Sequence, residues 1–291
     1  MNVLRYRHYI TYRRYIMYKA IKLEITGHTA VVTLNRPESL NAFTYPMIDE
    51  FGCAVEEAEK NTDVVGIIVT GAGRGFCAGV DMNTLDELQQ DGQGSRSDEL
   101  KVSPGDKEMG NNFGAGLTYL LSIRKPVIAA VNGPCVGLGM SLALFCDMRF
   151  ASDKAKFMTS FSPRGLVAEH GQSWILPRIL NPSKALDLLW SSRKVAADEA
   201  SEMGLIDRLF PPDRLMEETI NYIEELAKTV APKSLMAMKQ QIYRHLNMQL
   251  GEAMQDTTRL MDASMVRNDF KEGIASFVEK RPPVFEKIII D

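Results

Sequence analysis

The chain has 291 residues, of which 45% are hydrophobic and 24% are charged, and its formal net charge is −3. This near-neutral balance gives no support for nucleic-acid binding, and no apolar run approaches the roughly eighteen residues that a membrane-spanning helix needs. The length allows one large domain or two small ones. The four cysteines have neither metal-ligand spacing nor the density of a disulfide scaffold. We therefore expect a cytoplasmic protein with reduced thiols, no metal, and no nucleic-acid or membrane partner.

Residues 1–16 differ in composition from the rest of the chain. They contain four arginines interleaved with tyrosines, and the first acidic residue is Glu24. A basic, acid-poor start is compatible with a transit peptide or with contact to an anionic membrane or nucleic acid. Transit peptides are usually rich in serine, however, and this segment has none. We expect residues 1–16 to lie outside a fold that begins at Met17.

The next part of the chain alternates short apolar segments with an amphipathic one. Residues 21–25 and 30–34 predict two strands joined by a turn. Residues 46–60 predict a helix, because apolar residues recur at helical spacing and a proline opens the segment. Val64–Thr70 reads as a buried strand that runs into the glycine-rich segment Gly71–Met82. Strand and helix in alternation are typical of a layered α/β architecture.

A second strand-to-glycine unit lies between Lys125 and Asp147. Val127–Val131 predicts a buried strand, and Gly137-Leu138-Gly139 opens a helix over residues 140–145 that has no polar stripe and is expected to be buried. Backbone N–H groups at a helix start are unpaired and favour negative charge, so we expect an anionic group at Leu138. The glycine spacing fits neither a dinucleotide-binding nor a P-loop fingerprint. Two interpretations remain: a developing oxyanion held by backbone donors, or tight helix packing that glycine permits.

The remaining segments are a polar stretch and a helical C-terminal region. Residues 83–112 are polar, which is typical of a mobile surface loop, and a loop this long often covers an active site. Beyond Phe210 the pattern predicts helices over residues 214–230, 232–246, 250–267 and 270–278. Their many methionines indicate helix packing or subunit contacts.

Several motifs, taken together and in order, resemble the crotonase superfamily, the enoyl-CoA hydratase/isomerase family. They are LNRPESLNAF at residues 34–43, the two glycine-rich units, FSPRGLVAEHG at 161–171, AADEASEMGLIDRLFPPD at 196–213 and KEGIASFVEKRPPVF near the C-terminus. The resemblance covers residues 21–285. It implies an α/β fold with a spiral of ββα units over residues 17–210 and a helical oligomerisation region over 211–291. It also implies a homotrimer or a dimer of trimers.

The resemblance implies an acyl-CoA thioester substrate, with coenzyme A as part of the substrate and no separate cofactor. The thioester carbonyl is expected between the backbone N–H groups of Val80 and Leu138, which stabilise the enolate where its charge develops. The family pattern places coenzyme A against Ala78, Val80, Asp81 and Met82. It adds Phe277 and Lys280 from the C-terminal region, often from a neighbouring subunit; the alternative for both is a helix end with a solvated lysine.

The acid–base positions depart from the hydratase pattern of two glutamates. Those positions hold Ser141 and Phe161, and the remaining carboxylate is Glu169. A lone base suffices to move a double bond from the 3 to the 2 position, so the resemblance implies Δ3-Δ2 enoyl-CoA isomerisation through Glu169. One alternative is a hydratase in which Ser141 or His170 holds the water. Another is a non-catalytic acyl-CoA-binding homologue, with Glu169 only a charge at a helix N-terminus.

Overall fold

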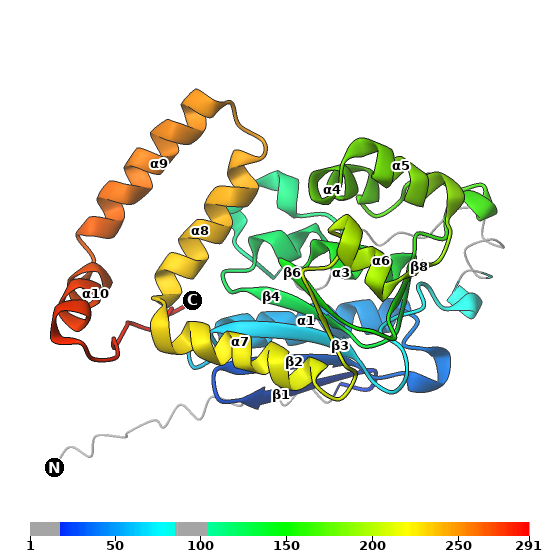
Figure 1. The fold of residues 1–291 in the computed structure, drawn as a ribbon, viewed down its shortest axis with the longest axis horizontal. Helices are drawn as coiled ribbons and strands as arrows, with labels where there is room; N and C mark the ends of the chain where they lie inside the picture. The colour runs from blue at the N-terminus through cyan, green and yellow to red at the C-terminus, as the bar shows by residue number, and fades with distance from the viewer. Residues whose placement is uncertain (1–17, 85, 87–103, 291) are drawn as a thin grey trace, which may run out of the picture.

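The computed structural model describes residues 18–84, 86 and 104–290 (Figure 1). Residues 1–16 and most of the polar stretch 83–112 therefore lie outside the described residues. The main sheet has six strands in the order β1-β2-β3-β4-β6-β9. The β1–β2 pair is antiparallel and every later pair is parallel. The strands are β1 Ile21–Thr26, β2 Thr29–Leu34, β3 Gly66–Gly71, β4 Val127–Val131, β6 Met148–Ser152 and β9 Arg208–Phe210.

A smaller sheet of three strands lies beyond the end of β4. It consists of β5 Pro134–Val136, β7 Lys156–Met158 and β8 Val195–Ala196 in the order β5-β7-β8. Because β5 follows β4 after two residues, the chain passes directly from the main sheet into the smaller one. The α3 helix, Leu138–Phe145, starts two residues after β5 and is buried along its whole length.

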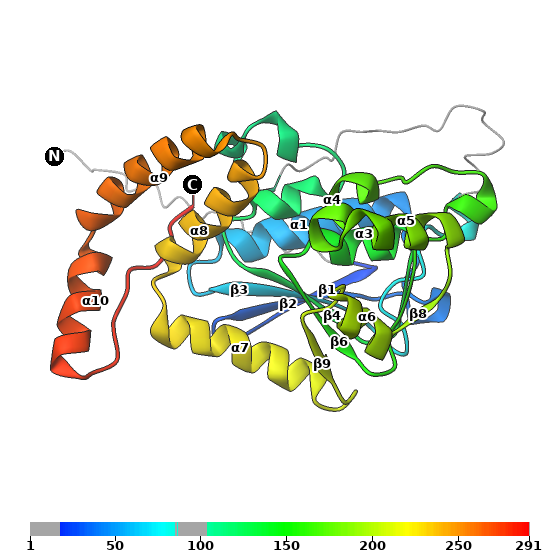
Figure 2. The same ribbon diagram turned by 45° about the horizontal axis from the view of Figure 1, so that its top comes forward.

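Helices cover both faces of the main sheet, as Figure 2 shows with α1 and α3 on one side and α7 on the other. All residues of β3 and β4 are buried, which explains their uninterrupted apolar sequence. On the second face, Ile68 and Ile128 pack with Ile223 of α7. After α3 the next helices along the chain are α4 Gln172–Ile179, α5 Pro182–Ser191, α6 Ala197–Met203 and α7 Leu215–Thr229.

The α1 helix, Tyr45–Lys60, is fixed at both ends. At its start the Thr44 side chain accepts a hydrogen bond from the Met47 N–H. At its end the Lys125 ammonium donates to the carbonyls of Ala58 and Asn61. Burial lowers the pKa of Lys125 to about 8. These contacts tie α1 to the segment that leads into β4.

The last three helices form what we call the C-terminal arm: α8 Pro232–His245, α9 Leu250–Met265 and α10 Asn268–Glu279. Figure 1 shows α9 and α10 standing apart from the sheets. The arm is attached through Asp147, at the end of α3. Its carboxylate lies 2.7 Å from Lys239 Nζ and accepts a hydrogen bond of 2.9 Å from the Tyr243 hydroxyl, both on α8. The same carboxylate accepts from the Val127 N–H at 2.7 Å.

Most of the predicted elements are confirmed, with shifts of one or two residues at their ends. The strand Val127–Val131 and the start of the helix at Pro232 agree with the structure. The buried helix begins at Leu138 rather than Met140, because Gly139 lies inside its first turn and not before it. The described end of the polar stretch contains short helical turns at Lys107–Met109 and Asn111–Phe113, tied to α1 by the Gly105 N–H and Glu59.

Asp147→Ala is expected to lower the free energy of unfolding by about 3 kcal/mol. The substitution leaves the buried ammonium of Lys239 without its carboxylate, and breaking such a buried pair is costly. Urea denaturation followed by circular dichroism measures the effect. Asp153→Ala is the matched control, because Asp153 pairs with Lys154 at the surface and its loss should change stability by less than about 0.5 kcal/mol. Equal effects of the two substitutions would contradict the role of Asp147.

Candidate active site

Two loops that follow neighbouring parallel strands pair with each other beyond the sheet edge. The Cys77 N–H donates to the Pro134 carbonyl at 3.0 Å, and the Val136 N–H donates to the Cys77 carbonyl at 2.9 Å. The approach is so close that a Cβ atom on Gly139 would lie 2.3 Å from the Cys77 oxygen. Glycine at position 139 is therefore a steric requirement of this pairing.

The pairing brings together the two N–H groups expected to hold an oxyanion. Leu138 is the first residue of α3, and its N–H has no intrahelical acceptor. Gly137 before it has φ 54° and Gly79 has φ 109°, both in the left-handed region that favours glycine. A Cβ atom on Gly79 would lie 3.9 Å from the Leu138 nitrogen. Within the part of the chain that the structure describes, neither the Val80 nor the Leu138 N–H is hydrogen-bonded.

These donors line a pocket of about 440 Å³ at the N-terminal end of α3. The structure brings the expected residues Ala78, Val80, Asp81, Met82, Leu138 and Glu169 to this one pocket. Phe161, Arg164 and His170 also line it. Three segments far apart in the sequence thus converge on a space in which a carbonyl group and a carboxylate can meet. The roles of these residues stay predictions.

Glu169 is presented by a turn just before α4. The side chain is 27% exposed, and its Oε2 lies 3.8 Å from Nε2 of His170. His170 and Gly171 both have positive φ, of 51° and 75°, so the turn reverses the chain sharply. Gly171 is the N-cap residue of α4, and no side chain caps this helix. The carboxylate therefore makes no capping hydrogen bond to α4, and the alternative of a charge at the helix N-terminus stays open.

Asp81 and Glu169 are the only acids among the described residues that line the pocket. Asp81 is held by Arg36 Nη1 at 2.9 Å and by the Asn83 N–H at 3.1 Å. Its carboxylate is thus engaged within the protein, which leaves Glu169 as the acid available to a substrate. Arg164 also lines the pocket, and its guanidinium donates to the Ser160 carbonyl at 2.7 Å.

The two positions at which hydratases carry glutamates are apolar or buried here. Phe161 is a buried aromatic wall of the pocket, and its ring centroid lies 6.3 Å from that of His170. Ser141 is fully buried, and its hydroxyl accepts a hydrogen bond of 2.9 Å from Gln172 Nε2. Ser141 is not among the residues that line the pocket. A water held by Ser141, which the hydratase alternative invokes, therefore has no support in this geometry.

The sequence and the fold match known proteins over nearly the whole chain. The family model described as enoyl-CoA hydratase/isomerase matches residues 24–288. The chain belongs to the enoyl-CoA hydratase/isomerase family. The expected resemblance to the crotonase superfamily and its α/β fold is thereby confirmed, and the chain is an enzyme of this family.

Relatives in this family carry the names of two reactions. A probable enoyl-CoA hydratase of Rhizobium meliloti is 33% identical over 270 residues, which is 92% of this chain and 98% of the relative. The peroxisomal Δ(3,5)-Δ(2,4)-dienoyl-CoA isomerase of Arabidopsis thaliana is 29% identical over 88% of this chain and 91% of its own. A solved enoyl-CoA hydratase structure from Geobacillus kaustophilus has a TM-score of 0.79 and 32% identity, covering 92% of this chain and 98% of that one.

Two of the residues expected at the coenzyme A site lie far from this pocket. Phe277 lies on α10, with 85% of its surface exposed, and Lys280 follows the helix end with φ 54°. Neither lines the pocket of its own chain. Their expected role, which assigns them to the site of a neighbouring subunit, stays a prediction.

Among the described residues, no helix is long and apolar enough to span a membrane.

Two residues that support the loop before Val80 were not predicted from the sequence. Asn41, buried and with φ 59°, donates through Nδ2 to the carbonyls of Ala72 and Gly75. Arg36 Nη1 donates to the Ala42 carbonyl as well as to Asp81. Both residues belong to the motif LNRPESLNAF, so the family resemblance was a signal for their importance, although not for these contacts.

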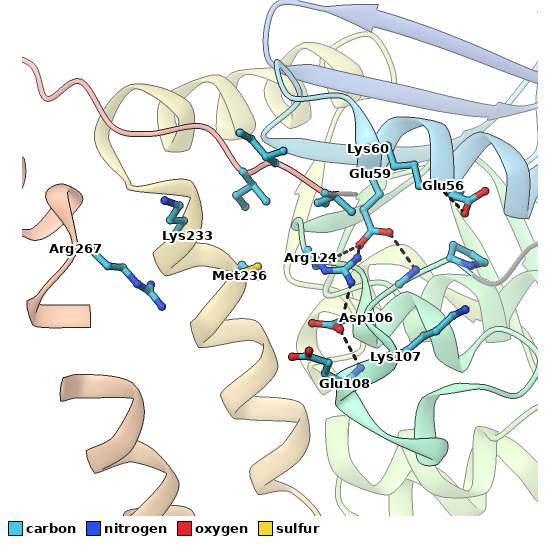
Figure 3. A pocket seen from close by; sticks show the side chains of 15 residues that line it. Glu56, Glu59, Lys60, Asp106, Lys107, Glu108, Arg124, Lys233, Met236 and Arg267 are labelled. Atoms are coloured by element: carbon cyan, nitrogen blue, oxygen red, sulfur yellow. Dashed lines mark hydrogen bonds and ion pairs between the residues drawn. The ribbon is translucent and has the colours of Figure 1, made fainter. Parts of the chain in front are cut away.

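A larger pocket, of about 750 Å³, lies between α1, residues 104–108, α8 and the C-terminal tail (Figure 3). In Figure 3 Glu59 and Asp106 flank Arg124, and both pair with its guanidinium at 3.2 Å. The Glu59 carboxylate also accepts from the Arg124 N–H at 2.8 Å. Neither oxyanion donor is among the residues that line this pocket. The charges of Glu59, Asp106 and Arg124 thus hold neighbouring segments together, and size alone does not make this pocket the active site.

Gly139→Ala is expected to lower both stability and activity. The added methyl group would meet the Cys77 backbone, which cannot move without opening the pairing of the two loops. We expect a loss of about 2 kcal/mol or more in the free energy of unfolding, measured with urea. Gly251→Ala on α9 is the matched control: a Cβ there meets nothing within 4 Å, and stability should stay within about 1 kcal/mol. Tolerance of alanine at both positions would contradict the steric argument.

Proposed function

We propose that this enzyme catalyses Δ3-Δ2 isomerisation of enoyl-CoA thioesters, with Glu169 as the single base. The observation that carries this proposal is the pocket itself, in which two unpaired backbone N–H groups occur together with the Glu169 carboxylate, 3.8 Å from His170 Nε2. The family shares a chemistry in which charge develops on a thioester oxygen, and backbone donors stabilise such charge without reorganising. The second carboxylate of the described pocket lining, that of Asp81, is already engaged by Arg36 and by the Asn83 N–H, which disfavours a role in activating water.

In the proposed reaction the thioester oxygen lies between the Val80 and Leu138 N–H groups. The Glu169 carboxylate removes a proton from C2 of the 3-enoyl chain, and the electron pair of that C–H bond delocalises to give a dienolate. Removing one N–H donor from an oxyanion hole typically costs about 3 kcal/mol of transition-state stabilisation. The protonated Glu169 then returns its proton to C4 as the double bond moves to the 2 position. No group is consumed, so the reaction needs no cofactor beyond the coenzyme A of the substrate.

Hydration of a 2-enoyl thioester is the second candidate. It is favoured by the names of the relatives in Rhizobium and Geobacillus and by the position of His170, which lines the pocket 3.8 Å from Glu169. In this version Glu169 takes a proton from a water molecule and His170 helps to hold that water. A non-catalytic acyl-CoA-binding role has no support from the relatives reported above, which carry enzyme names.

We further propose that coenzyme A contacts the loop from Ala78 to Met82, and that Phe277 and Lys280 reach it from another copy of the chain. Met82 is 66% exposed at the pocket mouth, where an extended ligand can cover it. A homotrimer, or a dimer of trimers, would bring one C-terminal arm to the next subunit's pocket. A cytoplasmic location is proposed on composition alone.

The purified enzyme is expected to convert trans-3-enoyl-CoA to trans-2-enoyl-CoA, with little hydration of the 2-enoyl product. Glu169→Gln should lower kcat for this conversion by roughly 10²- to 10⁴-fold, because the amide cannot accept the C2 proton. Absorbance of the conjugated thioester follows the reaction directly.

Glu225→Gln, at an exposed position of α7, is the matched control and should leave kcat unchanged. Rapid hydration of 2-enoyl-CoA that depends on Glu169 would favour the second candidate instead. Turnover of neither thioester would contradict both.

The assembly is expected to sediment as three or six chains. Many apolar side chains of the C-terminal arm are exposed in the single chain, and burying them on a neighbouring copy is favourable. Analytical ultracentrifugation of the purified protein measures the mass. Ile242 on α8 is 61% exposed, and Ile242→Glu should shift the protein towards monomers. The substitution should also raise KM, because a monomer lacks the Phe277 and Lys280 that a neighbouring copy would bring to the site. A monomeric wild-type enzyme with full activity would refute this assembly.

A further inference from the structure

The peptide group between Gly137 and Leu138, which carries one of the two expected oxyanion donors, is held by the side chain of Gln172. Gln172, the first residue of α4, is completely buried. Its Nε2 donates to the Gly137 carbonyl at 3.2 Å and to the Ser141 hydroxyl at 2.9 Å. The Gly137 carbonyl also accepts from the Ser141 N–H at 3.0 Å. These contacts place side-chain and backbone donors on one carbonyl oxygen.

This carbonyl and the Leu138 N–H belong to the same peptide group. Because the peptide is planar and trans, the direction of the Gly137 C=O bond fixes the opposite direction of the Leu138 N–H bond. Gly137 has φ 54° and ψ −117°, and its own N–H donates to the Met158 carbonyl at 3.0 Å, so Gln172 adds to a backbone restraint on this residue. Donors on the carbonyl also polarise the peptide, which makes the N–H at its other end a stronger donor.

Gln172 contacts the base as well as the oxyanion peptide. Its own N–H donates to the Glu169 carbonyl at 3.1 Å. One residue therefore connects the turn that presents Glu169 to the peptide that presents the Leu138 N–H. A second contact holds the same turn on α3: a Cβ on Gly171 would lie 2.7 Å from Phe145 Cζ, so the two helices meet without space between them.

Among the described residues, the amide at position 172 has only one of its two polar atoms hydrogen-bonded. Within the described part of the protein its Oε1 is buried without a hydrogen-bond partner, and such an orphaned acceptor is destabilising. A methionine of similar size would fill the same space without this defect. The feature that only the amide supplies is the Nε2 donor, which reaches Gly137 and Ser141.

We propose that Gln172 is a positioning residue that orients and polarises the Gly137–Leu138 peptide and sets its distance from Glu169. The proposal rests on the proposed function in one respect: the Leu138 N–H must face the thioester oxygen. Ser141, which stands where hydratases carry a glutamate, then serves as a relay between the Gln172 amide and the start of α3.

Gln172→Met tests this proposal. The variant keeps the volume of the side chain and removes the donor, so kcat for enoyl-CoA turnover should fall roughly ten-fold while KM stays unchanged. Its melting temperature should equal or exceed that of the wild type, because the orphaned acceptor is gone. Gln172→Leu serves as a second variant if the methionine fails to fold. Gln240→Met is the matched control, since Gln240 on α8 loses a similar hydrogen bond, to Asp106 at 2.7 Å, away from the pocket.

A measurement without turnover separates this proposal from the proposed function. Butanoyl-CoA, labelled with ¹³C at its thioester carbonyl, reports polarisation by the two N–H groups through its infrared C=O stretching frequency. The bound wild-type frequency should be lower than in water, and Gln172→Met should lose part of that shift. This result would support the role of Gln172 even if neither enoyl-CoA is converted. An unchanged kcat and frequency in the variant, or no shift in the wild type, would overturn it.

Discussion

The backbone pairing between the loops after β3 and β4 is the constraint on which the site depends. β3 and β4 are parallel neighbours, with Ile67 opposite Val127, so their ends lie at the same edge of the sheet. Beyond that edge the loops continue to pair through Cys77, Pro134 and Val136. Where the pairing ends, the chain turns into α3 on one side and bends at Gly79 on the other. Among the described residues, the N–H groups of Val80 and Leu138 are unpaired because the backbone pairing between the two loops does not extend to them.

An oxyanion site made from backbone N–H groups tolerates bulky side chains on the residues that supply those groups. Leu138 carries an isobutyl group at a crowded place, yet it is accommodated as a buried residue at the start of α3. Glycine is required instead at positions 79, 137 and 139, where φ is positive or another backbone comes close. Reactivity then depends on what faces the donors. With Ser141 buried and Phe161 apolar, the proposed acid–base chemistry rests on the turn around Glu169, which is why we propose proton transfer within the substrate rather than activation of water.

Local patterns in the sequence predicted the elements better than the contacts between them. The strand Val127–Val131 and the C-terminal helices were predicted because apolar periodicity is a property of neighbouring residues. The anchor between Asp147 and Lys239 joins residues almost a hundred positions apart, so no local pattern could predict it. Gln172 was not predicted either, because a single glutamine in the sequence gives no sign of which carbonyl it will reach. For Glu169 and Leu138, the family resemblance supplied what periodicity could not.

The C-terminal arm gives a physical reason to expect that the site is completed by a second copy. No residue of α9 is buried, and a helix of its 16 residues is marginal in water without tertiary packing. Its apolar side chains, such as Met254 and Met261, are half exposed, as is Phe270 of α10. Among the described residues no element buries α9, so association with a second copy would stabilise the arm. Because the same arm carries Phe277 and Lys280, association that stabilises α9 would also deliver these side chains to a neighbour. Folding of the arm and binding of the nucleotide end of the substrate would then depend on one contact.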